Sequence, residues 1–201
     1  MSLRALSFRS LLAFGLIALP ALAAGPAPKA PAPKPGGDCW RPVPVAVLAP
    51  QAGVTAHTFT KTAPREAKET AVLDGDLHLA ITHWGCRFIM LTFRLESKAL
   101  PDLSKNVPAG YLEAARQIRH LAKLKARTGF NLEGAARALE AAAKHPKGLA
   151  YSRPVSIPGS RLDKVTVQGG GPSKGGNDLA FEFMRPLPKK KQPMKKQPLK
   201  K

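Results

Sequence analysis

Apolar and polar residues alternate through much of the first half of the chain, and this period of two predicts β-strands. Residues 77–82 carry leucine or isoleucine at every second position, and residues 88–95 resume the pattern after a Trp84-Gly85 break. Asp74-Gly75 predicts a hairpin just before residues 77–82, because a type I′ turn requires positive φ angles. The pattern therefore indicates an antiparallel β-meander.

Shorter apolar runs precede this pair and complete the predicted meander; they cover residues 43–48, 57–60 and 69–73. Pro44 has no N–H to donate to a ladder, so we expect the first run to form an edge strand. Residues 88–95 are apolar on both faces until Thr92, which predicts a central strand that is covered on both sides.

The apolar spacing then changes to three and four residues, which predicts two α-helices. The first helix has Pro108 in its opening turn, Asn106 or Val107 at its entry, and Gly129 as its C-terminal stop. Asn131 is the expected N-cap of the second helix. The apolar stripes consist of Tyr111, Ala114, Ala115, Ile118, Leu121 and Ala122, and of Leu132, Ala135, Ala136, Leu139, Ala142 and Ala143. These features predict an αα-hairpin with a very short connection that buries both stripes.

Strand-like patterns return at residues 155–157, 164–168 and 179–184. The segment GGGPSKGGND, residues 169–178, is typical of a long flexible hairpin loop. The order of the elements predicts an α+β fold: an antiparallel β-meander, then an αα-hairpin, then a C-terminal β-hairpin. The strand order within the sheet does not follow from the sequence.

Residues 1–23 have the features of a secretory signal peptide. Arg4 and Arg9 precede a short apolar core, and Ala21-Leu22-Ala23 places small residues where signal peptidase cleaves. The apolar core is too short to span a bilayer comfortably, so we expect no transmembrane segment in the mature chain. The expected location is therefore the periplasm or the outside of the cell.

Two basic, proline-rich segments flank the region expected to fold. Residues 24–37 alternate Pro, Ala and Lys and predict a disordered linker, and residues 186–201 predict a disordered tail. The tail holds seven lysines, namely Lys189, Lys190, Lys191, Lys195, Lys196, Lys200 and Lys201. Residues 38–185 remain as a single α+β domain, a size that suits one hydrophobic core.

The positive charge of the chain lies largely in these flanking segments. The whole chain has a formal net charge of +19, while residues 38–185 hold 21 Lys and Arg against 13 Asp and Glu. The lysine-rich tail predicts electrostatic association with an anionic surface. No aromatic residue lies among the tail lysines, which disfavours nucleic acid as the partner because base stacking is not provided for.

The chain has two cysteines, Cys39 and Cys86, each beside a tryptophan. In an exported protein two cysteines usually pair, so we expect a disulfide between them. This bond closes a loop of about 46 residues and adds roughly 4 kcal/mol in the loop-entropy model. A catalytic thiol and a metal ligand are the alternatives, with His83 near Cys86 in sequence but on the other side of a turn.

No catalytic, metal or cofactor motif is found in the sequence. The five histidines form no pair with metal-ligand spacing, and His78 and His83 fall on opposite strand faces by parity. Lys174 precedes Gly175-Gly176 rather than following the glycines, so the glycine-rich segment does not match a phosphate-binding loop. Neither a catalytic residue nor a cofactor is assigned, and the chain is not expected to be an enzyme.

Three hypotheses follow from these observations. The preferred one is an exported, non-enzymatic protein of the cell envelope whose lysine tail binds anionic lipid or polysaccharide. The second is an inhibitor or immunity protein whose folded domain binds a partner protein. The third is an exported hydrolase of unrecognised type, which a cluster of His57, His83 and an acid in one concave pocket would favour.

Overall fold

The computed structural model describes residues 41–188. The predicted signal peptide and linker lie outside the described residues, as do Cys39 and residues 189–201 of the predicted tail, which hold all seven tail lysines. The predicted start of the tail at residue 186 was too early, because Pro186 is the last residue of the final strand and pairs with Phe88.

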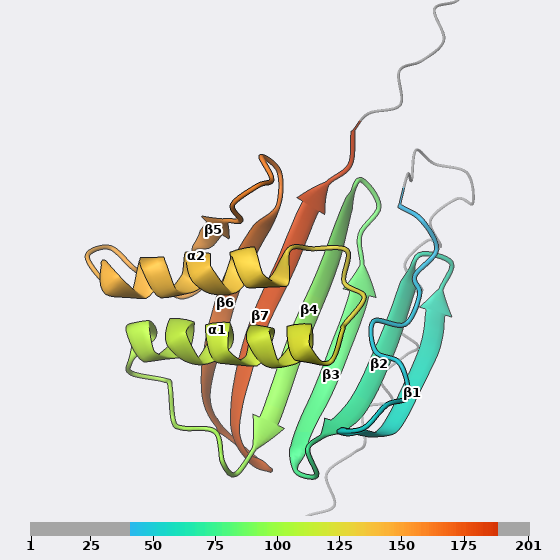
Figure 1. Ribbon diagram of the computed structural model, residues 1–201, viewed down its shortest axis with the longest axis horizontal. Helices are drawn as coiled ribbons and strands as arrows, with labels where there is room; N and C mark the ends of the chain where they lie inside the picture. Colours follow the sequence, from blue (N-terminus) through green and yellow to red (C-terminus); the bar gives the residue numbers. More distant parts are fainter. Residues whose placement is uncertain (1–40, 189–201) are drawn as a thin grey trace, which may run out of the picture. The chain divides into compact units, whose positions relative to one another are not determined.

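The described residues form one antiparallel sheet with two helices on one face (Figure 1). The sheet has seven strands in the order β1-β2-β3-β4-β7-β6-β5. In chain order the elements are β1 (Val54–Ala63), β2 (Glu66–Leu73), β3 (Leu77–Trp84), β4 (Phe88–Ser97), α1 (Val107–Lys123), α2 (Leu132–Lys144), β5 (Pro154–Ser156), β6 (Lys164–Ser173) and β7 (Gly176–Pro186). The α+β class with an antiparallel sheet and a helical pair is confirmed.

The strand pattern of the meander was predicted well. Asp74 and Gly75 have φ angles of 48° and 91°, as a type I′ turn between β2 and β3 requires. β4 is the middle strand of the seven, with β3 on one side and β7 on the other. The chain therefore returns from the helices to insert its last strand at the centre of the sheet.

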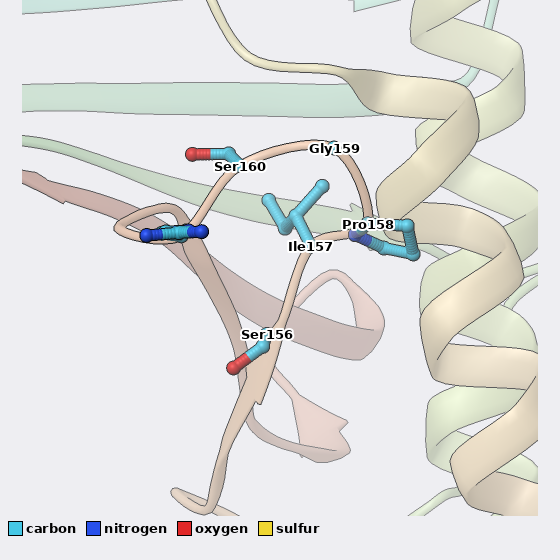
Figure 2. Close-up of a pocket in the computed structure, with 6 residues that line it drawn as sticks. Ser156, Ile157, Pro158, Gly159 and Ser160 are labelled. Atoms are coloured by element: carbon cyan, nitrogen blue, oxygen red, sulfur yellow. The ribbon is translucent and has the colours of Figure 1, made fainter.

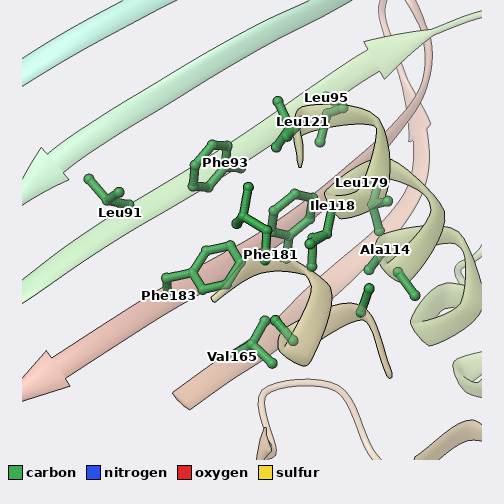
Figure 3. Packing of buried hydrophobic residues seen from close by; sticks show 14 of the residues in the cluster. Leu91, Phe93, Leu95, Ala114, Ile118, Leu121, Val165, Leu179, Phe181 and Phe183 are labelled. Carbon is green, nitrogen blue, oxygen red and sulfur yellow. The ribbon is translucent and has the colours of Figure 1, made fainter. Parts of the chain in front are cut away.

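The hydrophobic core lies between the helices and one face of the sheet (Figure 3). Phe93 of β4 stacks on Phe181 of β7 with ring centroids 5.2 Å apart, and Phe183 packs edge-on against both. Ile118 and Leu121 of α1 are fully buried in the same cluster. Figure 1 shows the helices over the β4–β5 half of the sheet, while the segment that enters at residue 41 runs along the β1–β3 half.

The prediction of a strand at residues 43–48 was wrong. This segment is not a strand, although Val47 and Leu48 are buried in the core. Their backbone N–H groups donate to the two carboxylate oxygens of Glu69, each at 2.8 Å. A side chain of β2 therefore takes the place of a neighbouring strand as the hydrogen-bond acceptor.

The connection between the helices is longer than predicted. α1 begins after the N-cap Asn106, as expected, but it ends at Lys123 rather than near Gly129. Lys125 has a φ of 51°, and the N–H groups of Lys125 and Ala126 donate to the carbonyls of Ala122 and Leu121. This is a Schellman motif, with Lys125 in the left-handed position that we had assigned to Gly129.

The prediction of a long flexible loop at residues 169–178 was also wrong. β6 and β7 continue through this segment and are joined only by Lys174 and Gly175. A Cβ atom on Gly170 would lie 2.7 Å from the carbonyl oxygen of Asp178 and 3.2 Å from Leu103. Because these glycines have no side chains, the segment before α1, which includes Leu103, can pack closely against the β6–β7 hairpin.

Candidate functional site

Glu69 is the centre of a buried polar cluster on the core face of β2. Its side chain is fully buried, and besides the two backbone donors it is bonded by two histidines. His57 Nε2 lies 2.9 Å from Oε1, and His83 Nε2 lies 3.3 Å from Oε2. The sequence analysis named His57, His83 and an unspecified acid as a possible cluster, but it did not identify Glu69 as the acid, because β1, β2 and β3 each contribute one residue.

The electrostatics of Glu69 match a structural role. Burial raises the pKa of its carboxyl, but the hydrogen bonds from His83, Val47, Leu48 and His57 outweigh burial and hold the pKa below its usual value. Glu69 is therefore an ionised acceptor whose two oxygens are both occupied. Such a carboxylate fastens the segment before β1 to the sheet.

The cluster also bears on the hydrolase hypothesis. His57, His83 and an acid do come together, as that hypothesis required, but they do so beneath residues 47 and 48 rather than in a concave pocket. Within residues 41–188, no group of three or more His, Cys, Asp or Glu side chains is arranged to hold a metal ion. In this cluster both oxygens of Glu69 are engaged in hydrogen bonds, from Leu48 and His57 at Oε1 and from Val47 and His83 at Oε2.

Cys86 lies in the turn between β3 and β4, at residues 85–87. The backbone N–H of Arg41 donates to the carbonyl of Cys86 at 3.1 Å, so the start of the described chain lies against this turn. Arg41 follows Cys39 by two residues in sequence. Because Cys39 lies outside the described residues, its pairing with Cys86 stays a prediction.

The other end of the described chain meets the same turn. After β7, the N–H of Leu187 donates to the carbonyl of Arg87 at 2.8 Å. The first described residue and one of the last described residues are thus bonded to consecutive positions of one turn. Both ends of the described chain therefore lie at this end of the sheet.

The turns at this end of the sheet are more basic than those at the opposite end. They join β1 to β2, β3 to β4, and β5 to β6, and each carries an exposed or half-exposed arginine: Arg65, Arg87 and Arg161. We call these three arginines and their turns the basic end. The one acid in these turns, Asp163, is neutralised by Arg185 at 2.6 Å. The turns at the opposite end hold three acids and three lysines, namely Asp74, Asp76 and Asp102 with Lys98, Lys105 and Lys174.

A shallow hollow of about 500 Å³ lies in the β5–β6 turn (Figure 2). It is lined by residues 156–161, and Figure 2 shows the hydroxyls of Ser156 and Ser160 pointing to the same side of the loop. The Ser160 hydroxyl oxygen accepts hydrogen bonds from the N–H groups of Leu162 and Asp163. These bonds fix the loop that presents Arg161 at the basic end.

The helix-free face of the sheet carries mainly small and polar side chains. Arg94 of β4 pairs with Asp178 of β7 at 2.5 Å, and Thr92 donates to Glu182 at 3.3 Å. A second shallow hollow, of about 440 Å³, lies on this face between β2, β3 and β4 and includes Thr70, His78 and Arg94 in its lining. Burial raises the pKa of the Glu182 carboxyl, which the hydrogen bond from Thr92 only partly offsets.

Of the predicted site residues, the structure places Cys86 alone; Cys39 and the seven tail lysines lie outside the described residues. The sequence did not reveal the basic end, because its three arginines are far apart along the chain.

No helix between residues 41 and 188 has both the length and the apolar character needed to cross a membrane. In comparisons with known proteins, no family model, curated protein or solved structure matches the chain.

Proposed function

We propose that this protein is an exported, non-enzymatic component of the cell envelope that binds anionic surfaces through its lysine-rich tail. The observation that carries this proposal is the shared exit of both chain ends at the β3–β4 turn. Lys29 and Lys34 precede the first of these ends in sequence, and the seven tail lysines follow the second. We infer that both groups of lysines reach one surface together.

The energetics favour this arrangement over a tail that acts alone. Each lysine close to an anionic membrane contributes about 1 kcal/mol, and the attraction decays over a Debye length of about 8 Å at physiological salt. Segments that leave a domain at the same end raise one another's local concentration at a surface. Binding is therefore expected to be strong at low salt and to weaken steeply as salt is added.

The proposal includes export and a disulfide. Residues 1–23 are removed by signal peptidase, and Cys39 pairs with Cys86 in the oxidising compartment. The Arg41–Cys86 backbone hydrogen bond supports this pairing, because it holds the chain two residues after Cys39 against the turn that carries Cys86. The bond ties the base of the linker to the end of the sheet from which the tail also leaves.

Vesicle pelleting tests the tail. The mature chain, a variant lacking residues 189–201 and a full-length variant with all seven tail lysines replaced by glutamine are mixed with anionic or neutral vesicles at low and high salt; the truncation keeps Pro186 and Leu187, which are part of the folded end. We expect binding of the mature chain to anionic vesicles at low salt, and a large loss for both variants. Equal pelleting of all three proteins would refute the electrostatic role of the tail.

Binding of a partner protein by the folded domain is the second candidate function. The helix-free sheet face favours it, because no described helix covers this face of the seven strands. Retention of one defined protein by the tailless domain at high salt, lost when Arg94 is replaced by glutamate, would favour this function over surface binding. If the partner protein is retained equally well by the Arg94→Glu variant, the partner contacts a different part of the domain.

A further inference from the structure

We propose that the basic end of the folded domain itself docks on an anionic phospholipid bilayer, with its apolar side chains in the interfacial layer. The proposal rests on the proposed function and adds to it the orientation of the domain and the nature of the anionic surface. It concerns described residues of the domain, whereas the proposed function concerns the tail.

The first support is the apolar side chains at this end. Five large apolar residues are exposed on the described chain, and three of them lie in or beside the turns of the basic end or within two residues of Arg41. Trp84 is 40% exposed at the last position of β3, Leu162 is 52% exposed in the β5–β6 turn, and Val43 is 52% exposed two residues after Arg41. Tryptophan favours the membrane interface because its ring is apolar and its N–H is polar. In the folded domain the Trp84 N–H donates to Thr92 Oγ1 at 3.3 Å and the ring packs edge-on against Phe88, so the exposed part of Trp84 is its apolar ring.

The second support is the positive charge at the same end of the domain. Arg65, Arg87 and Arg161 form no ion pair with any acid among the described residues. Of the acids at this end, Asp163 is already paired with Arg185, and Glu66 at the first position of β2 interacts electrostatically with the buried Arg41. Exposed apolar groups at the same end as unpaired cations match a layer of phosphate headgroups above acyl chains.

The third support is the route of the chain. Arg41 is bonded to Cys86 and Leu187 to Arg87, so both ends of the described chain lie within the proposed contact surface. A bilayer explains the exposed Trp84 and Leu162, whereas a hydrated polysaccharide would need only the charge.

The experiment compares two triple charge reversals on the full mature chain. Arg65, Arg87 and Arg161 are each changed to glutamate in one variant, and Lys98, Lys105 and Lys174 in the other. Both variants change the net charge by the same amount, so a general charge effect weakens both equally. Affinity for phosphatidylglycerol–phosphatidylcholine vesicles is measured at moderate salt, after equal Tm values show that both variants fold.

We expect the arginine variant to bind at least about tenfold more weakly than the mature chain, and the lysine variant to change less than about threefold. A second measurement uses the fluorescence of Trp84 in a Trp40→Phe background. Its emission should shift to the blue with anionic vesicles and be quenched by brominated acyl chains. Leu162→Gln, which leaves the charge unchanged, should reduce the shift.

The outcomes separate this inference from the proposed function. Equal weakening of both triple variants, or Trp84 emission that vesicles leave unchanged, would overturn docking by the basic end even if tail removal abolishes binding. A blue shift of the same size with a soluble anionic polysaccharide would overturn the assignment of a bilayer. Vesicle binding that needs the arginines but not the tail would retain the inference and refute the proposed function.

Discussion

Replacing Glu69 by glutamine tests whether the buried carboxylate fastens the segment before β1 to the sheet. Glu69 accepts from Val47 and Leu48 at 2.8 Å, from His57 at 2.9 Å and from His83 at 3.3 Å. Glutamine has the same shape but only one acceptor oxygen. In either orientation its amide N–H₂ group faces one of the two backbone N–H groups, so a donor meets a donor.

The magnitude follows from these contacts. A buried N–H left without an acceptor costs about 1–3 kcal/mol, and each remaining bond loses the strength that a charged acceptor adds. We therefore expect Glu69→Gln to lower the free energy of unfolding by about 3 kcal/mol. For a domain of this size that corresponds to a fall in Tm of about 6–12 °C.

Urea unfolding of the parent and variant at several pH values is the assay. Because hydrogen bonds outweigh burial and lower the pKa of Glu69, its ionised form stabilises the folded state. This contribution is complete above the unfolded carboxyl pKa of about 4.3 and is lost as the pH falls through the lower folded value. The stability difference between parent and variant should therefore be constant near neutral pH and narrow in acid.

Glu133→Gln provides the matched control, because Glu133 is half-exposed and its contact with Arg119 is 3.6 Å long. That change should cost less than about 0.5 kcal/mol. A stability difference for Glu69→Gln below about 1 kcal/mol at pH 7, or one that does not narrow in acid, would refute the reasoning. Either result would mean that the four contacts do not hold the entry segment.

Two further changes test the packing and the predicted disulfide. Gly170→Ala should destabilise the domain by about 1–3 kcal/mol, because its Cβ would lie 2.7 Å from the Asp178 carbonyl oxygen; an unchanged Tm in calorimetry would mean that β6 and β7 can move apart there. Cys86→Ser should lower the Tm of the exported protein. Mass spectrometry of the exported parent protein should show no free thiol. A Cys86 that is readily alkylated in the native parent would contradict the disulfide.

The sequence predicted elements whose signals are local. The alternation at residues 77–82 and 88–95 reproduces the two faces of β3 and β4, since side chains in a strand point alternately to opposite sides. Asn106 and Asn131 cap α1 and α2, accepting from Ala109 at 3.0 Å and Gly134 at 2.9 Å. A helix N-cap bonds to a backbone N–H only three residues away, so the residue type at the cap position is enough to predict it.

The failures involve partners that are distant in sequence. Residues 43–48 have strand composition, but the acceptor for Val47 lies 22 residues away on a side chain. Residues 169–171 are glycines, which are typical of a loop, yet they belong to β6 and pair with β7. Leu103 packs against Gly170 of this hairpin. The basic end likewise depends on strand order, because Arg65, Arg87 and Arg161 share one end of the sheet only when the pairing of all seven strands is known.

The place of β7 at the centre of the sheet has a consequence for folding. β4 and β7 pair residues that are distant in sequence, such as Thr92 and Glu182, which are 90 positions apart. Closing so long a loop costs entropy before any contact is gained, and proteins rich in such distant pairings fold slowly. The first four strands therefore lack one neighbour and much of their core until nearly the whole chain has been synthesised, and we expect a long-lived unfolded chain that is competent to pass through a translocation channel.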